Sequence, residues 1–328
     1  MHKVIIDSNS GGQRADKFLK KYLPLAPQNF IYKMFRKKDV KLNGKRIDEK
    51  TMIQTGDVLE LFLYDDKVQS FQQEVQIEYL KPQFEVVYED DNILIVNKPV
   101  GLILHEDEKE KKNTLANQVL AYLYEKGAYN PNNNQGFVPG PVHRLDRNTS
   151  GLVIFGKTFN SLKDLNEMIR KRHCISKQYK TILVGQIKKS EHLIGYMKKD
   201  EKTNHCFMVS KDTLGALTME TIIDVEKSNK NYTLAKVTLV TGRTHQIRLH
   251  CASINHPVIG DRKYGDFKVN KLMKDKYHLA AQLLHAYGLT FVKSFGSLAY
   301  LEGKTFTCNV PQLFSQIQND LFNVEKRN

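Results

Sequence analysis

The sequence predicts an α+β fold in two domains. A small basic domain is expected over residues 1–75, and a larger domain over residues 76–328, in which helices flank a mixed, mainly antiparallel sheet. A length of 328 residues is typical of about two domains. Strand-like and helical stretches follow one another without regular βαβ alternation or a GxGxxG motif. A polar, glutamine-rich stretch over residues 65–83 separates two regions of different charge, which indicates a linker.

The overall charge gives the first indication of function. The chain has 50 Lys and Arg against 36 Asp and Glu, a net charge of +14. Such an excess is typical of proteins that bind nucleic acid, although it also occurs where it serves solubility alone. No apolar run approaches the ~18 residues that span a bilayer, and the first residues lack the apolar core of a secretion signal. The four cysteines stand singly, so we expect a cytoplasmic protein with neither disulfides nor a zinc site.

The basic residues concentrate near the N-terminus. Between Arg14 and Lys50, twelve Lys and Arg stand against four Asp and Glu. Apolar residues at helical spacing predict two amphipathic helices there. Asn43-Gly44 between alternating residues predicts a tight hairpin. The elements expected in this unit are helices over 15–23 and 29–37, the hairpin around 40–47, and a strand over 56–64.

The second unit is expected to consist mainly of strands. Two of them, over 84–88 and 93–97, are predicted to be buried and joined by a turn. The charged segment 105–113 is expected to be a solvated loop, and the turn-rich segment 128–140 to be mobile. The remaining predicted elements are helices over 114–125 and 160–171 and strands over 152–155, 179–187, 217–227, 232–241 and 286–292.

The segment PVHRLDRNTSG contains the first candidate for chemistry. Asp146 directly precedes Thr149-Ser150-Gly151 and a strand that looks buried, and Arg144 and Arg147 flank it. Nearby positive charge favours the ionised form of a carboxylate. An ionised Asp can act as a nucleophile or as a proton acceptor. The alternative is a turn aspartate that caps Thr149-Ser150.

A second polar segment, TGRTHQIRLHCASINHPVIGDRKYGD, contains several histidines and an aspartate, which are possible metal ligands. Its polar residues are Arg243, His245, Arg248, His250, His256 and Asp261. On a helix, His245 and His250 diverge by about 140°, and no HExxH motif is present, so we expect no metal. The guanidinium of Arg248 suits bidentate pairing with a remote carboxylate. The alternative is a solvated basic helix.

A third segment, SKQYKTILVG, offers an aromatic side chain at the start of a strand. Tyr179 stands between Lys177 and Lys180. Enzymes that act on a base need an aromatic face on which an extruded base can stack. The alternative is that Tyr179 is an ordinary core residue.

Together these segments resemble the RluA-type family of RNA pseudouridine synthases, in its RluC/RluD branch. The resemblance covers nearly the whole chain in order and spacing. The N-terminal unit is similar to a small RNA-binding module shared with a small-subunit ribosomal protein. The matching strings are NKPVGL (97–102), HRLDRNTSG (143–151), SKQYKTILVG (176–185), GRTHQIRLH (242–250), HPVIGDRKYG (256–265) and LLHAYGLTF (283–291).

The resemblance implies a pseudouridine synthase fold and a role for each matching residue. Asp146 would be the catalytic aspartate, Arg248 would form an ion pair with it, and Tyr179 would pack against the target uracil. Arg144 would help to extrude the base by filling its place in the RNA. The further substrate-binding candidates in these motifs are Lys98, His143, Arg243, His245 and Gln246.

The implied reaction breaks the N1–C1′ bond of a uridine, turns the ring and reattaches it through C5. One carboxylate suffices for this isomerisation, so we expect neither a metal nor an organic cofactor. The expected partner is RNA, with large-subunit ribosomal RNA favoured over transfer RNA, and the expected oligomeric state is a monomer. Two alternatives remain: a non-catalytic RNA-binding or ribosome-assembly protein, and a sugar or nucleoside hydrolase, which would normally need a second carboxylate.

Overall fold

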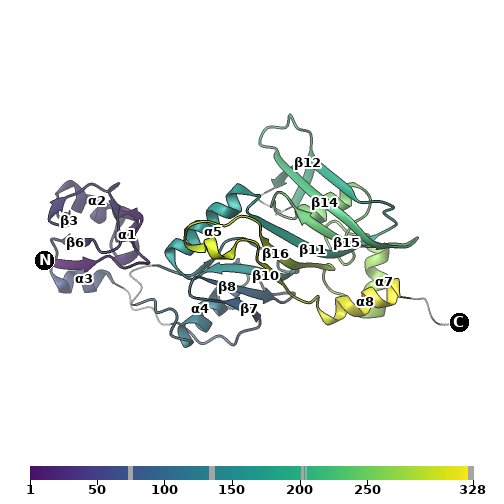
Figure 1. Cartoon of the computed structure of the whole chain (residues 1–328), viewed down its shortest axis with the longest axis horizontal. Coiled ribbons are helices and arrows are strands. Elements are labelled where there is room, and N and C mark those ends of the chain that lie inside the picture. Colours follow the sequence, from purple (N-terminus) through teal and green to yellow (C-terminus); the bar gives the residue numbers. More distant parts are fainter. Residues whose placement is uncertain (73–76, 133–136, 201–202, 204, 324–328) are drawn as a thin grey trace.

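The computed structural model describes residues 1–72, 77–132, 137–200, 203 and 205–323. A small unit lies at one end of the long axis, and a larger unit built on one extended sheet occupies the rest (Figure 1). The sheet is mixed but mostly antiparallel, and helices flank it, so the predicted α+β class is confirmed. No helix among the described residues combines the length and the apolar character needed to cross a membrane.

The small N-terminal unit has a core of its own. Its helices bury Phe18, Leu19 and Ile31 against a four-stranded sheet of order β1-β6-β3-β4. Asn43 and Gly44 both have positive φ, as the predicted tight hairpin between β3 and β4 requires. The elements are β1 (His2–Ile5), β2 (Gln13–Arg14), α1 (Ala15–Tyr22), α2 (Gln28–Arg36), β3 (Val40–Leu42), β4 (Lys45–Arg46), β5 (Met52–Ile53), β6 (Val58–Leu61) and α3 (Asp65–Phe71).

The prediction that the linker begins at residue 65 is wrong. Residues 65–71 form α3, and Val68 is buried in the N-terminal core. One buried apolar side chain on a short helix is too weak a periodic signal to stand out in a polar stretch. Residues 73–76, also part of the predicted linker, lie outside the described residues.

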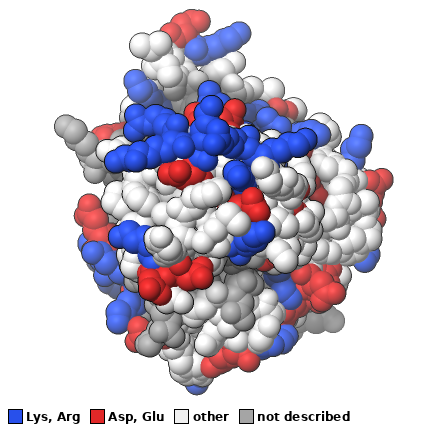
Figure 2. All heavy atoms as spheres, turned by 90° about the vertical axis from the view of Figure 1, so that its left-hand side faces the viewer, with Lys and Arg blue, Asp and Glu red and all other residues white. Residues whose placement is uncertain are grey.

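Basic side chains gather on the outside of the N-terminal unit. Figure 2 views the molecule from this end and shows a band of Lys and Arg side chains at the level of α2. The exposed basic residues of α1, α2 and the turn that follows are Lys17, Lys21, Lys33, Arg36, Lys37 and Lys38.

The larger unit is organised around an eleven-stranded sheet. Nine strands run in the order β13-β12-β14-β15-β11-β16-β10-β8-β7, while β17 pairs with β16 and β9 with β10. The strands are β7 (Glu85–Glu89), β8 (Ile93–Lys98), β9 (Gly140–Pro141), β10 (Ser150–Gly156), β11 (Ile175–Val184), β12 (Glu191–Asp200), β13 (His205–Val209), β14 (Leu217–Ser228), β15 (Tyr232–Leu239), β16 (Leu284–Phe291) and β17 (Thr305–Thr307). The helices are α4 (Leu115–Glu125), α5 (Phe159–Lys171), α6 (Gln246–Ser253), α7 (Phe267–Tyr277), a 3₁₀ helix η1 (Gly296–Leu301) and α8 (Gln312–Phe322).

Two predictions about burial and mobility need correction or restriction. Strand β8 is buried as predicted, but β7 is an edge strand whose residues are partly or fully exposed. In the turn-rich segment 128–140, Tyr129 and Phe137 are buried. Residues 133–136, on which the prediction of mobility also falls, lie outside the described residues.

Parallel pairing at one point brings two motif segments together. Among the described strands, β10 and β16 form a parallel pair, and it comprises Ser150–His285 and Gly151–Ala286. Gly151 has a φ of +116°, and a Cβ there would lie 2.2 Å from the carbonyl oxygen of Ala286. Glycine is therefore required where the two backbones meet. This contact fixes the start of β10 and, with it, the loop that carries Asp146.

Candidate active site

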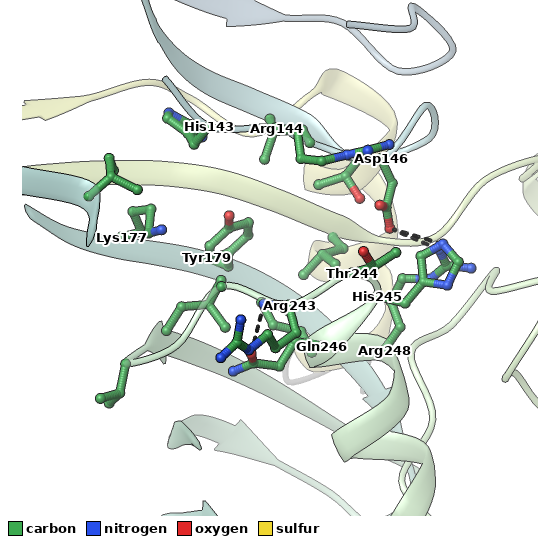
Figure 3. Close-up of a pocket in the computed structure, with 18 of the residues that line it drawn as sticks. His143, Arg144, Asp146, Lys177, Tyr179, Arg243, Thr244, His245, Gln246 and Arg248 are labelled. Atoms are coloured by element: carbon green, nitrogen blue, oxygen red, sulfur yellow. Dashed lines mark hydrogen bonds and ion pairs between the residues drawn. The ribbon is translucent and has the colours of Figure 1, made fainter. Parts of the chain in front are cut away.

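A cavity of about 440 Å³ opens beside the middle of the large sheet. Its walls come from the loop before β10, from β11, from the turn between β15 and α6, and from the end of α5. Figure 3 shows side chains of these segments pointing toward one another across it. A volume of this size is typical of small-molecule sites and is large enough for a nucleobase with its sugar.

Asp146 lies on a tight turn at the rim of this cavity. Its backbone carbonyl accepts a hydrogen bond from the Thr149 amide at 3.0 Å. The Thr149 hydroxyl in turn accepts from the Gln282 side chain at 3.2 Å, and Ser150 bonds the buried His285 at 2.8 Å. Among the described residues, the side chain of Asp146 does not cap Thr149 or Ser150, because its contacts run across the cavity to Arg248 and His245. The capping alternative is therefore wrong.

Arg248 connects two carboxylates. Its Nη1 donates to Asp146 Oδ2 at 2.8 Å, while its Nε and Nη2 donate to Asp261 Oδ2 and Oδ1 at 2.7 and 2.9 Å. Burial lowers the pKa of Arg248, but the hydrogen bonds and charge of Asp261, together with Asp146, outweigh it, so the pKa lies above its ordinary value. Arg248 therefore remains a cation that holds Asp146 in a fixed direction.

Asp261 is the anchor of this arrangement. Its side chain is fully buried, and it also accepts the backbone amides of Lys263 and Tyr264 at 2.8 and 3.1 Å. Burial raises the pKa of Asp261, but Arg248 and these amides lower it by more. The net shift of the pKa is therefore downward. Both carboxylate oxygens are occupied by Arg248, which leaves Asp146 as the carboxylate that faces the cavity.

The helix that carries Arg248 is not the solvated basic helix considered as the alternative. The first six residues of α6 are all buried. Its N-cap, His245, has φ and ψ of 55° and 19°, a left-handed conformation that is uncommon outside glycine and recurs at functional sites. His245 Nδ1 bonds the Tyr264 hydroxyl at 2.9 Å, and its Nε2 lies 4.0 Å from Asp146 Oδ2. Burial lowers the pKa of His245, although the charge of Asp146 opposes the shift.

Tyr179 forms one wall of the cavity from β11. The pairing of β11 with β16 shifts register between Gln178 and Tyr179. The extra residue, Tyr287, stands in β16, while β11 stays in regular register with β15, so Tyr179 keeps the alternation of its strand. Tyr179 is buried, and burial, together with the charge of Asp146, raises the pKa of its hydroxyl. In Figure 3 it lies between Asp146 and Lys177.

Gln246 and Arg243 both line the cavity. The side chain of Gln246 also holds the turn before α6 in its conformation. The Gln246 amide donates to Glu220 O and Thr221 Oγ1 at 2.9 and 3.0 Å. Its Oε1 accepts from Thr241 Oγ1 and from the Arg243 amide at 2.7 and 3.0 Å. The hydrogen-bonding groups of Gln246 are thus used within the protein, so the structure favours a positioning role over the predicted contact with substrate.

Lys98 is a second predicted substrate contact that the structure places elsewhere. It is fully buried, and its ammonium donates to the carbonyls of Pro99, Leu102 and Arg147 at 2.9, 2.8 and 3.1 Å. Burial lowers the pKa of Lys98 to about 7, while the charge of Asp146 opposes the shift. Lys98 does not line the cavity. It connects the segment after β8 to the loop of Asp146.

The two arginines beside Asp146 differ from each other in their contacts. Arg147 donates to Asp107 at 2.7 Å and does not line the main cavity, so its guanidinium pairs with a carboxylate other than Asp146. Arg144 is exposed and lines the main cavity and a second one that shares Asp146 and Arg248. His143 accepts a hydrogen bond from the Ile154 amide at its Nε2, and its buried Nδ1 has no partner among the described residues.

Sequence reasoning missed several residues of the site. Asp261 stands in the polar segment that was singled out, yet nothing in its spacing indicated that it pairs with Arg248. Lys177 was named as a neighbour of Tyr179 but given no role, although period-2 alternation places it on the same face of β11. Among the described residues no group of three or more His, Cys, Asp or Glu side chains has the arrangement of a metal site.

Comparisons with known proteins identify the family of this chain. Residues 92–253 match the family model of RNA pseudouridylate synthases. An uncharacterized RNA pseudouridine synthase of Mycoplasma genitalium is 32% identical over 89% of this chain and 90% of its own length. A protein of Buchnera aphidicola named ribosomal large subunit pseudouridine synthase C is 30% identical over 88% of this chain and 89% of its own.

The fold agrees as well. The structure of human RNA pseudouridylate synthase domain containing 4 superposes with a TM-score of 0.56 at 20% identity, covering 74% of this chain and 94% of that one. The chain therefore belongs to the RNA pseudouridine synthases of the RluA type, in the RluC-like branch, and it is an isomerase that acts on RNA.

Proposed function

We propose that this chain converts uridines of large-subunit ribosomal RNA into pseudouridine, with Asp146 as the catalytic carboxylate. The observation that carries the proposal is the position of Asp146 on the cavity wall, held by Arg248, which Asp261 anchors in turn. The choice of RNA is supported by relatives named ribosomal large subunit pseudouridine synthase C, among them one of Haemophilus influenzae at 30% identity over 88% of this chain.

The target uracil is proposed to leave its helix and enter the cavity against Tyr179. Extruding a base costs a few kcal/mol, which contacts between protein and RNA offset. Arg144 is exposed at the rim and is proposed to fill the place of the base. The exposed Lys and Arg of α1 and α2 are proposed to hold the RNA backbone.

Asp146 then acts on the nucleotide by one of three routes that use the same carboxylate. It attacks C1′, adds to the ring at C6, or removes the C2′ proton. In each route the N1–C1′ bond breaks, the uracil turns within the cavity, and a C5–C1′ bond forms while the C5 proton is lost and N1 gains one. Arg248 holds the carboxylate in place, and the buried walls keep the detached uracil from leaving.

The test is to map pseudouridines across the RNA of cells that have or lack the gene, and then to treat the affected RNA with the purified protein. We expect one or a few sites in large-subunit RNA to lose pseudouridine without the gene and to gain it in vitro. Sites confined to transfer RNA would contradict the proposed substrate, and no change at any site would contradict the activity.

A further inference from the structure

Four cations line the cavity besides Arg144 and Arg248. Arg170 and Arg172 line it from the end of α5, Lys177 from β11, and Arg243 from the turn before α6. We call these four residues the cationic end. Asp146 is the one Asp or Glu among the described residues that line the cavity, and Figure 3 shows it on the other side of Tyr179 from Lys177.

The cations of this end are also unpaired. Within the part of the chain that the structure describes, the side chains of Arg170, Arg172 and Lys177 have no hydrogen bond and no ion pair. The guanidinium of Arg243 donates to a single backbone carbonyl, that of Thr218, at 3.2 Å. By contrast, Arg248 at the other end uses three nitrogens on two carboxylates.

Keeping Lys177 and Arg243 charged without an anion costs free energy, whereas Arg170 and Arg172 are exposed. Burial lowers the pKa of Lys177. Burial and then the charge of Arg172 lower the pKa of Arg243. Arg172 itself has a φ of +62°, a conformation that L residues rarely adopt. Gly242 makes room for Lys177, because a Cβ there would lie 3.3 Å from the ammonium nitrogen. Strain and like-charge crowding of this kind persist where function requires them.

We propose that the cationic end binds a phosphodiester of the substrate RNA next to the target nucleotide. This inference rests on the proposed function and adds a second anchor to it. Lys177 and Tyr179 are separated by one strand repeat, about 7 Å. A nucleotide whose base packs on Tyr179 therefore keeps an adjoining backbone phosphate within reach of Lys177. Arginine forks match the geometry of phosphate oxygens, whereas a neutral uracil carbonyl would leave most of the charge uncompensated.

The experiment removes the charge from either partner in turn. RNA fragments that contain the mapped uridine carry an uncharged methylphosphonate at the linkage 5′ or 3′ of it. Matched fragments carry a natural phosphate and the same 2′-deoxy sugar. Fluorescence anisotropy gives Kd for the wild type, for Lys177→Gln, and for Lys163→Gln, an exposed lysine on α5 outside the cavity. Single-turnover assays on all-ribose RNA give the rate of conversion at saturation.

One of the two methylphosphonates should weaken wild-type binding about tenfold. Lys177→Gln should bind natural RNA about tenfold more weakly, show little further loss with that methylphosphonate, and reduce the salt slope of Kd by about one. Its rate at saturation should stay within about threefold of wild type. Lys163→Gln should show the full methylphosphonate effect.

Equal methylphosphonate effects in the wild type and Lys177→Gln would overturn the proposal, as would a loss confined to the rate at saturation, which would assign Lys177 to the base. If Lys177→Gln fails to fold by circular dichroism, Arg170→Gln, an exposed cation of the same end, takes its place in the same cycle with the same expected results. A wild type that binds RNA with the methylphosphonate effect but forms no pseudouridine would contradict the proposed function and leave the phosphate site standing.

Discussion

Arg248 and the basic residues of α2 occupy opposite extremes of exposure in this chain. The Arg248 side chain is 7% exposed, and three of its nitrogens donate to carboxylates. Lys33, Arg36 and Lys37 are exposed, and the structure, over its described residues, gives them no carboxylate partner. Both regions are basic, but the charge of Arg248 is paired with carboxylates inside the protein, whereas the charges of Lys33, Arg36 and Lys37 face solvent.

The difference predicts two kinds of consequence. A buried, paired cation fixes the direction of a reacting group, and removing it leaves buried carboxylates unpaired. An exposed cation contributes little to the fold, but it adds to RNA affinity through released counterions, in proportion to the number of phosphates contacted. Changes at the buried site should therefore alter the rate of reaction, and changes in the N-terminal unit should alter affinity.

The largest effect is expected from Asp146→Asn. Asn is nearly isosteric but is neither a nucleophile nor a base, so the rate of pseudouridine formation at saturating enzyme should fall about 10³-fold or more. RNA binding should stay within about threefold, because the fold and the cations remain. Single-turnover assays measure the rate, and Asp224→Asn, an exposed carboxylate on β14, is the matched control. Activity within tenfold of wild type would remove Asp146 from its role.

Arg248→Met should act mainly on the same step. Without Arg248 the Asp146 carboxylate loses its direction, and the saturated rate should fall about 10²-fold or more. Asp261 is then buried without its ion-pair partner, so the variant should also melt at a lower temperature. Arg147→Met, which removes an exposed arginine from the loop of Asp146, should leave the rate near wild type. An Arg248→Met variant that loses affinity but reacts normally once saturated would make Arg248 a phosphate contact.

Arg248→Lys distinguishes the effect of Arg248 on stability from its effect on the rate of reaction. Lysine keeps the charge beside Asp261 but cannot donate to both carboxylates as the fork does. We expect it to restore most of the melting temperature but little of the rate. Recovery of both would mean that charge alone, and not the direction of the fork, is what Asp146 requires.

Deleting residues 1–75 tests the other side of the comparison. The N-terminal unit has its own core, so the larger unit should remain folded. Affinity for structured ribosomal RNA should fall by about 10- to 100-fold, because a tethered second site multiplies binding. The salt dependence should flatten, while a short fragment that enters the cavity still reacts. Titrations of both proteins at several salt concentrations provide the measurement, and equal affinities and slopes would contradict this division of labour.

The sequence predicted the residues of the site better than their contacts. Asp146 was singled out because nearby positive charge keeps a carboxylate ionised, and Arg248 because a guanidinium suits pairing with a remote carboxylate. The structure brings them to 2.8 Å. Arg144 and Arg147 were expected to keep Asp146 ionised because they flank it in sequence. On a tight turn, however, neighbouring side chains diverge, and Arg147 pairs with Asp107 instead.

Buried polar residues were the hardest to assign. Lys98 and Gln246 stand in matching motifs and were expected to contact substrate, but their hydrogen bonds hold backbone segments in place. A sequence does not distinguish a polar side chain that faces a ligand from one that satisfies buried carbonyls, because both need the same donors. Helix α3 was missed because its apolar residues are sparse, and strands β12 and β13 were missed because their apolar residues do not alternate with polar ones.

The smallest effect is expected from acid, and it should fall on one region alone. Burial lowers the pKa of His250 and His285 to about 4 and that of His143 to about 3. All three lie in the larger unit, whereas residues 1–72 contain a single histidine, His2. A histidine whose folded pKa is depressed contributes stability that is present above its unfolded pKa of about 6.5 and is lost as pH falls toward the folded value.

Between pH 6.5 and 5.5, each such group should therefore remove about 1 kcal/mol from the free energy of unfolding of the larger unit, about a fivefold change in its equilibrium. Hydrogen exchange at the two pH values, corrected for intrinsic rates, should show protection falling in β10, β11 and β16 but not in α1 and α2. His285→Asn should reduce this pH dependence, because it removes a fully buried imidazole, while His278→Asn, at an exposed left-handed position, should not. Equal loss of protection in both units would mean that acid acts on the whole chain, and that buried ionisable groups do not distinguish the two regions.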